Sequence, residues 1–142
     1  MSRITLEQAS TIIATAFAKG GALGLKPLSV AVLDAGGHLI AFERQDGAST
    51  LRPQIACGKA GGALALGVSS RKIGDMAAER PAFIGALGPI SPLGVIPAAG
   101  GIIVVDDGGA PLGAVGVTGD TSDNDEICAL EGIAAAGLAS QA

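Results

Sequence analysis

Two segments of the chain repeat one pattern, in which a compact apolar strand is followed by a turn of the type Asp-x-Gly-Gly and then by a second apolar strand. The first segment covers residues 28–42, with its turn at 34–37, and the second covers residues 101–117, with its turn at 106–109. Short apolar runs on both sides of a Gly-rich turn are typical of β-hairpins. Two such hairpins predict an antiparallel sheet.

N-terminal capping signals mark the first and the last helix. Thr5 and Gln8 have the spacing of a capping box, and apolar residues follow at helical intervals as far as Gly20. Residues 123–126 have a similar capping character, with Asp123 as the expected N-cap, and an apolar stripe follows them. Both helices are expected to pack on the sheet through one face.

The sequence between the hairpins predicts two more helices and a long connection. Residues 53–68 form a glycine- and alanine-rich helical stretch, and Ser70 can cap a third helix that Pro81 would end. The connection at 85–101 is rich in proline and glycine and is longer than most loops that only join two elements. A lid, a subunit contact or an edge strand near 93–96 is therefore expected there.

The order of elements is therefore αββααββα, with room for one more strand. This order predicts a mixed α/β (α+β) fold, in which helices pack on an antiparallel sheet of four to five strands. With 142 residues the chain has the usual length of one domain, so we expect a single domain over residues 1–142.

The composition is unusually apolar for a chain of this length. Hydrophobic residues make up 49% of the sequence and charged residues 15%, and the mean hydropathy is +0.53. Because surplus apolar surface is commonly buried between subunits, a homo-oligomer is expected. No apolar run reaches the length of a membrane span, and the first residues lack the apolar segment of a secretory signal. We therefore expect no membrane partner and a cytoplasmic location.

Nucleic acid is not expected as a partner. The net charge is −4, Tyr and Trp are absent and only three Phe occur, so the chain lacks a basic patch and a stacking platform. Cys57 and Cys128 lie far apart in expected helices, which favours buried, reduced side chains over a disulfide or a metal knuckle. The sequence contains neither Gly-x-Ser-x-Gly nor a His/Cys cluster to support hydrolase or zinc chemistry.

The clearest candidate site is the stretch 113–126, where an apolar strand runs into a polar turn and then into a helix. Glycine and hydroxyl residues at such a junction expose backbone N–H groups at the positive end of a helix dipole, which suits a polar ligand. Asp120 and the carboxylates after it would repel phosphate and favour helix capping, a hydroxylated or cationic ligand, or a hard metal ion. Thr118, Gly119 and Asp120 are the candidate residues of this turn.

Further candidate ligand-binding residues lie near the second helix and the third strand. Arg52 and Lys59 are seven residues apart, which places them about two turns apart on one helix face. Arg can bind a carboxylate in bidentate fashion, and Lys adds a point charge. The alternative is that both residues lie on a solvated helix face and bind no ligand. An unpaired charge is costly, however, in the apolar run that holds Lys59. Gly100 and Gly101 would let a ligand approach the backbone closely.

The single histidine, His38, directly follows the glycine pair of the first hairpin. Its ring could reach out from the edge of the sheet and ligate iron or transfer a proton. A solvent-facing turn histidine is the alternative. His38 and Asp120 are therefore the candidate proton-transfer residues, and His38 is also the candidate metal ligand.

Several short motifs occur together along the chain: Ser-Val-Ala-Val-Leu-Asp-Ala-Gly-Gly-His-Leu-Ile-Ala-Phe at 29–42, Asp-Gly at 46–47, Ile-Ala-Cys-Gly-Lys-Ala at 55–60, Pro-Ala-Ala-Gly-Gly-Ile-Ile at 97–103, and Gly-Ala-Val-Gly-Val-Thr-Gly at 113–119 with Asp-Glu at 125–126. As a set, they resemble the haem-degrading domain family, which comprises the GlcG or HbpS-like proteins and the C-terminal domain of PduO-type adenosyltransferases. The resemblance runs nearly end to end. It implies a profilin-like fold, frequent oligomerisation and, in some members, haem binding.

The first functional hypothesis is a protein that binds haem, or another planar carboxylate-bearing small molecule, at a pocket between subunits. Arg52 and Lys59 would hold a haem propionate, and the iron would take one protein ligand. The possible iron ligands in the sequence are His38, Cys57, Cys128, Met76 and Met1.

Two other hypotheses stay open. One is a catabolic isomerase, tautomerase or lyase acting on a small hydroxy or oxo acid. In that scheme Arg52 or Lys59 binds the carboxylate, while Asp120 or His38 moves a proton. The other is a structural or regulatory oligomer without a ligand of its own.

Overall fold

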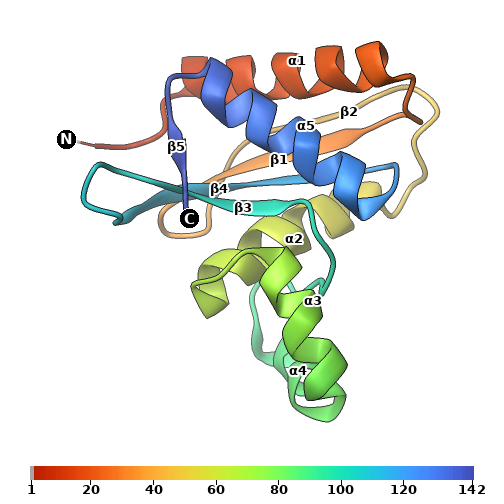
Figure 1. Ribbon diagram of the computed structural model, residues 1–142, viewed down its shortest axis with the longest axis vertical. Helices are drawn as coiled ribbons and strands as arrows, with labels where there is room; N and C mark the ends of the chain where they lie inside the picture. The colour runs from red at the N-terminus through yellow and green to blue at the C-terminus, as the bar shows by residue number, and fades with distance from the viewer. Residues whose placement is uncertain (1) are drawn as a thin grey trace.

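The computed structural model describes residues 2–142 and contains one five-stranded antiparallel sheet in the order β2-β1-β4-β3-β5 (Figure 1). Its strands are β1 (Ser29–Asp34), β2 (Leu39–Arg44), β3 (Gly101–Val105), β4 (Pro111–Thr118) and β5 (Ala139–Ser140). Strands β1 and β4 are neighbours at the centre, where Ser29 lies opposite Thr118 and Asp34 lies opposite Gly113. The sheet thus joins strands from both halves of the chain.

The two hairpin turns have the same hydrogen-bonding geometry. In each turn, one carboxylate oxygen of the aspartate, Asp34 or Asp106, accepts hydrogen bonds of 2.9 Å from the backbone N–H groups two and four residues further on. The second glycine of each turn has a positive φ, 82° in the first and 86° in the second, which glycine adopts without strain. His38 and Ala110 occupy the equivalent last position of the two turns.

The helices form layers on both faces of the sheet (Figure 1). They are α1 (Leu6–Leu23), α2 (Arg52–Leu66), α3 (Ser70–Glu79), α4 (Pro81–Leu87), the 3-10 helix η1 (Gly88–Ile90) and α5 (Ser122–Ala135). Helices α1 and α5 cover one face and α2 covers the other, while α3 and α4 project away from the sheet on the side of α2. Within residues 2–142, no helix is both long and apolar enough to cross a membrane.

The two faces of the sheet are packed differently. Large buried side chains such as Val30 and Val117 fill the space between the sheet and the layer of α1 and α5. On the other face, small residues let the backbone of α2 lie close to the strands, and a Cβ atom on Gly116 would overlap the carbonyl oxygen of Ala56. This close approach explains why the sequence of α2 is rich in glycine and alanine.

The predicted order αββααββα and the antiparallel sheet are confirmed, but the strand expected at 93–96 is wrong. The fifth strand, β5, follows the last helix instead. Leu93 and Ile96 pack on α2, in the space that two helix glycines leave open: a Cβ on Gly58 would lie 2.7 Å from Ile96 Cγ1, and one on Gly61 would lie 2.8 Å from Leu93.

The expected N-cap is confirmed for α1 but is wrong for α3 and α5, and the N-cap of α3 is Ser69 instead of Ser70. The capping box of α1 is confirmed, since the Gln8 backbone N–H donates to Thr5 Oγ1 at 3.1 Å. The N-cap of α5 is Thr121, so the expectation of Asp123 in that role is wrong. Pro81 follows the end of α3 as expected, and it is also the first residue of α4. Its fixed φ suits the first turn of a helix.

Candidate functional site

All candidate site residues except His38 lie at one end of the sheet, where β3, α2 and α5 begin and β4 ends. These residues are Arg52, Lys59, Gly100, Gly101, Thr118, Gly119 and Asp120. His38 lies in the turn at the far end of β1. Because β1 runs from Ser29, opposite Thr118, to Asp34, the two ends are separated by roughly 17 Å. Within one chain, His38 therefore cannot share a small substrate with Asp120.

Arg52 begins α2 and points to the end of β4. Its Nη1 donates a hydrogen bond of 2.7 Å to Thr118 Oγ1, and the contact is partly buried. Among residues 2–142, no carboxylate lies within salt-bridge distance of the Arg52 guanidinium. Most of its five N–H donors are therefore available to another acceptor.

Lys59 is buried, and its charge is paired within the protein. Its side chain is 3% exposed, and Nζ lies 3.2 Å from Asp125 Oδ2 and 3.0 Å from the Val117 carbonyl oxygen. The other carboxylate oxygen of Asp125 accepts a hydrogen bond of 2.9 Å from the Asp120 backbone N–H. Burial lowers the pKa of Lys59, and the Asp125 carboxylate opposes this shift. Lys59 thus joins α2, β4 and α5 and has little access to a ligand.

Gly100 and Gly101 allow the start of β3 to approach Lys59 and the backbone of α2. Gly100 has a φ of 125°, and a Cβ there would lie 2.8 Å from Lys59 Nζ. A Cβ on Gly101 would overlap the Lys59 carbonyl oxygen. The Gly101 backbone N–H donates to Ser70 Oγ at 2.7 Å. In this structure, the space that the two glycines leave open is occupied by the protein itself.

Asp120 is fully engaged in the loop before α5. Its oxygens accept hydrogen bonds from Asn124 Nδ2 at 2.9 Å, from the Thr121 backbone N–H at 2.8 Å and from the Lys26 backbone N–H at 3.1 Å. These bonds, with that of Asn124 first, lower the pKa of Asp120 to about 2. A carboxylate held in this way is a weak base, so the geometry does not favour proton transfer by Asp120.

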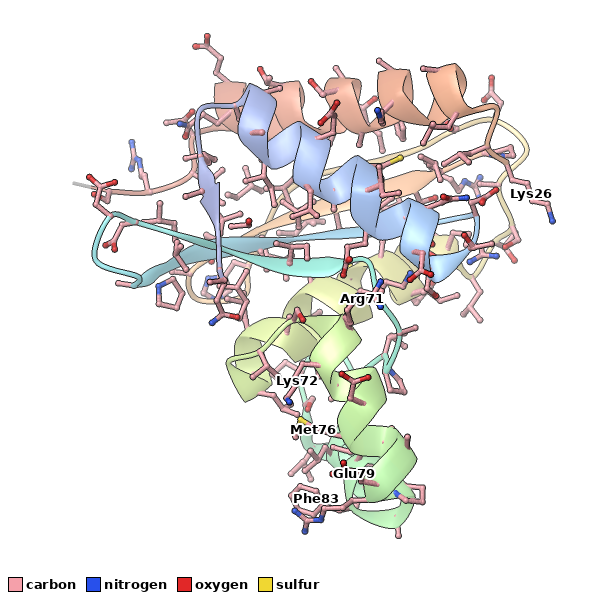
Figure 2. All side chains as sticks on the ribbon, in the orientation of Figure 1. Lys26, Arg71, Lys72, Met76, Glu79 and Phe83 are labelled. Carbon is pink, nitrogen blue, oxygen red and sulfur yellow. The ribbon has the colours of Figure 1, made fainter. Side chains whose placement is uncertain are left out.

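A small cavity of about 180 Å³ opens beside Arg52. Its lining consists of Lys26, Pro27, Gly47, Ala48, Ser49, Arg52 and Gly119. Lys26 projects outward from this end of the molecule (Figure 2). The cavity therefore combines cationic groups with backbone from three loops.

His38 is exposed at the opposite end of the sheet. Its side chain is 81% exposed, and Nδ1 lies 3.4 Å from Asp34 Oδ1. Asp34 is fixed by its turn, and its pKa is lowered, chiefly by the hydrogen bond from the His38 backbone N–H. The imidazole is thus oriented through Nδ1, while Nε2 faces away from its carboxylate partner.

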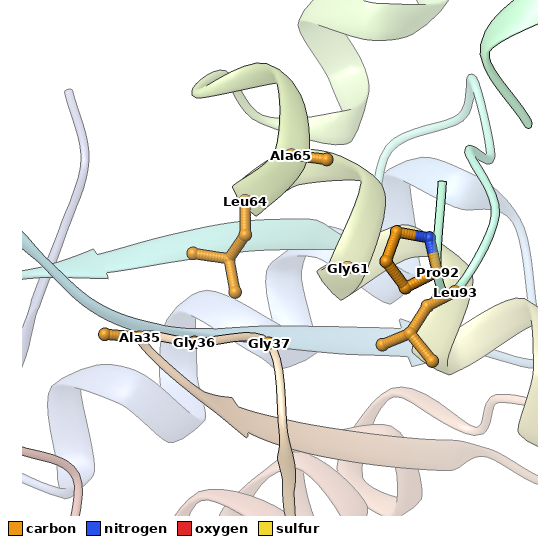
Figure 3. Close-up of a pocket in the computed structure, with 8 residues that line it drawn as sticks. All are labelled: Ala35, Gly36, Gly37, Gly61, Leu64, Ala65, Pro92 and Leu93. Atoms are coloured by element: carbon orange, nitrogen blue, oxygen red, sulfur yellow. The ribbon is translucent and has the colours of Figure 1, made fainter. Parts of the chain in front are cut away.

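Two hollows flank the turn that holds His38. One is a recess of about 460 Å³ between this turn and the residues before α1, and it is lined by Ser2, Arg3, Ile4, Thr5, Leu6, Asp34, Ala35, Gly36, His38, Ile40 and Leu112. The other, of about 240 Å³, lies between the turn and α2 and is lined by Ala35, Gly36, Gly37, Gly61, Leu64, Ala65, Pro92 and Leu93 (Figure 3). Arg3 was not a candidate from sequence, because nothing local connects it with a hairpin more than thirty residues away.

The comparisons with known proteins agree on one family. The sequence matches the family described as haem degrading protein HbpS-like over residues 4–134. Comparison with curated proteins gave no match. Among solved structures, a double mutant of HbpS from Streptomyces reticuli has 30% identity and a TM-score of 0.80, with 94% of this chain and 87% of that chain covered.

Two further solved structures share the fold. Protein ORFY of Klebsiella pneumoniae has 25% identity and a TM-score of 0.84, with 96% of this chain and 93% of that chain covered. A haem complex of PduOC has 21% identity and a TM-score of 0.87, with 99% of this chain and 100% of that chain covered. The predicted profilin-like fold is thereby confirmed. The protein belongs to the HbpS-like family of haem-degrading proteins.

Proposed function

We propose that the protein binds haem in the recess beside His38, and that a second copy of the chain covers the part of the haem that one chain leaves open. The observation that carries the proposal is an exposed imidazole, oriented by Asp34, at the border of a partly apolar recess. Support also comes from membership of the HbpS-like family and from the structural similarity to a PduOC haem complex.

His38 has the features of an axial haem ligand. A histidine that binds a metal through one ring nitrogen usually has its other nitrogen fixed by a carboxylate or a carbonyl group. Asp34 supplies that carboxylate, and its own position is fixed by backbone N–H groups of the turn. His38 would thus offer Nε2 to the iron, whose chemistry when bound is that of the haem itself.

The other possible iron ligands fit less well. Burial raises the pKa of Cys57, and burial is also the main cause that raises the pKa of Cys128 to about 11, so neither thiol favours the thiolate that binds iron. Met76 lies on the projecting helix α3, away from the sheet (Figure 2). Met1 lies outside the described residues.

The surroundings of His38 suit an amphipathic, planar molecule. Ile4, Ile40 and Leu112 supply an apolar lining, and Arg3 adds a guanidinium that can bind a propionate. Leu6 and Leu39 are 64% and 56% exposed in the single chain. Because this recess is open and its neighbourhood is apolar, a second copy of the chain is the proposed cover, which makes the site one between subunits.

The other predictions from the sequence have less support. An isomerase, tautomerase or lyase would need a base near Arg52, but Asp120 is engaged and His38 lies at the other end of the sheet. The cytoplasmic location and a role in catabolism stay predictions from the sequence alone.

Haemin titration followed at the Soret band tests the proposal. The wild-type protein should show a saturable shift that His38→Ala removes and that added imidazole restores in that variant. Arg3→Gln should weaken binding by roughly tenfold, through loss of a charge-assisted hydrogen bond. Arg52→Gln is the matched control, because it removes the same charge at the far end of the sheet and should leave haemin binding unchanged.

Two results would contradict the proposal. The first is a Soret spectrum and affinity of His38→Ala equal to those of the wild type. The second is a shift that never saturates in any variant, which would indicate incidental apolar binding. Sedimentation velocity with and without haemin tests the second copy, since a haem site between subunits requires at least a dimer in the bound state.

A further inference from the structure

The imidazole of His38 lies against the backbone of its own turn, at Gly36. A Cβ atom on Gly36 would lie 2.9 Å from His38 Cε1 and 3.0 Å from His38 Nδ1. A real Cβ atom is essentially never found closer than 3.0 Å to another heavy atom of this kind. The same Cβ would lie 3.4 Å from Asp34 Oδ1, close to an ordinary contact. The ring therefore occupies the place that a side chain at position 36 would need.

The backbone of the turn does not itself need glycine at position 36. Gly37 has a φ of 82°, which favours glycine, whereas the φ of Gly36 is not positive. Gly108 holds the equivalent place in the second turn, and its N–H donates to the turn aspartate in the same way. Apart from its chain neighbours, a Cβ on Gly108 would meet only Asp106 Oδ1 within 4 Å, at 3.5 Å, among the described residues. The ring of His38, and not the turn, thus excludes a side chain at position 36.

This arrangement also determines which ring nitrogen faces outward. Nδ1 lies 3.4 Å from Asp34 Oδ1, and that oxygen is fixed by the backbone N–H groups of Gly36 and His38, each at 2.9 Å. A neutral imidazole with one nitrogen beside a carboxylate carries its proton on that nitrogen. The lone pair of Nε2 then points away from the turn. Since the side chain is 81% exposed, the contacts with Gly36 and Asp34 are the ones that hold the ring.

We propose that Gly36 is a positioning residue for His38. Its lack of a side chain lets the imidazole lie against the turn, with Nδ1 at Asp34 and Nε2 directed outward as the metal-binding nitrogen. The consequence for haem rests on the proposed function above, whereas the position of the ring depends on no ligand. Gly36→Ala should displace the ring from Asp34 and leave the fold intact, because an exposed side chain can rotate away.

NMR spectra of the haem-free protein test the position of the ring. His38 is the only histidine in the sequence, so its ring signals are unambiguous. The wild type should show a nuclear Overhauser effect between His38 Hε1 and the Hα atoms of Gly36, and its neutral imidazole should carry the proton on Nδ1. In Gly36→Ala the tautomer with the proton on Nε2 should gain population, while the matched control Gly108→Ala should match the wild type. An unchanged tautomer in Gly36→Ala would overturn the proposal.

Urea unfolding separates positioning from a structural role of the turn. The midpoints of Gly36→Ala and Gly108→Ala should both be no lower than that of the wild type, because alanine restricts the unfolded chain and neither position has a positive φ. A midpoint that falls for Gly36→Ala alone would mean that the first turn itself requires glycine, and this result would also overturn the proposal.

Haemin titration tests the consequence for the ligand. Changes to the residues that orient a metal-binding histidine typically weaken metal binding by about 10- to 100-fold, so Gly36→Ala should weaken haemin binding by roughly tenfold. Gly108→Ala should leave it unchanged. If the ring is displaced but Gly36→Ala binds haemin as the wild type does, Gly36 has no positioning role, and the loss in His38→Ala still supports the haem site. If His38→Ala itself binds haemin normally, the haem site fails, and the NMR spectra alone decide the position of the ring.

Discussion

Removing the charge of Lys59 should strongly destabilise the fold. Lys59→Met keeps a side chain of similar length but leaves the Asp125 carboxylate, 1% exposed, without its cationic partner. Breaking a buried ion pair from one side typically costs about 3–5 kcal/mol. Since a domain of this kind is stable by about 5–15 kcal/mol, the variant should lose a large share of its free energy of unfolding. Urea unfolding followed by circular dichroism at pH 7 measures this loss.

Two comparisons make the test specific. The double variant Lys59→Met with Asp125→Asn keeps an acceptor for the Asp120 backbone N–H and removes both charges, so it should lose less than the sum of the two single variants. Lys19→Met breaks an exposed pair with Glu131, at 3.7 Å, and should cost less than about 1 kcal/mol. A loss below about 1 kcal/mol for Lys59→Met, or additive losses in the double variant, would refute the buried-pair argument.

Two further predictions concern pH and packing. Because the folded pKa of Asp120 is depressed to about 2, its stabilising contribution is present above the unfolded pKa near 3.8 and is lost as the pH falls towards 2. Acid titrations followed by fluorescence of a bound dye should therefore show a shallower decline for Asp120→Asn, and parallel curves would contradict this. Gly116→Ala should cost about 1–3 kcal/mol in urea unfolding, because its Cβ overlaps the Ala56 carbonyl oxygen. Gly21→Ala should instead stabilise α1 by up to about 1 kcal/mol, because within the described part of the chain its added Cβ meets no packing neighbour closer than 4 Å.

The parts of the fold that were predictable have local sequence signals. The hairpins and the capping box of α1 depend on residues a few positions apart, and the structure contains both. The prediction of a strand at 93–96 was wrong because apolar residues there can also pack against a helix. In the structure they fill the space above Gly58 and Gly61 on α2. Strand β5 has two residues, too few for any periodic pattern.

The candidate site was predictable only in part, because its partners are distant in sequence. The spacing of Arg52 and Lys59 on one helix predicted a similar ligand-binding role for both. In the structure Asp125, 66 positions after Lys59, pairs with Lys59, whereas no carboxylate among residues 2–142 pairs with Arg52. Ser29 Oγ is buried without a hydrogen-bond partner among residues 2–142, and nothing in the sequence predicts this, since a serine in a strand usually finds a partner. Only the register of β1 and β4 brings Ser29 to Thr118.

The equivalence of the two hairpin turns bears on what histidine does at position 38. Ala110 occupies the same place in the second turn, with the same hydrogen bonds to its aspartate, so the backbone there forms equally well around a methyl side chain. The second turn therefore shows, within the same chain, that an alanine at this position is compatible with the turn. A loss of haemin binding in His38→Ala would therefore result from the missing imidazole, because the second hairpin turn shows that this backbone geometry forms without one.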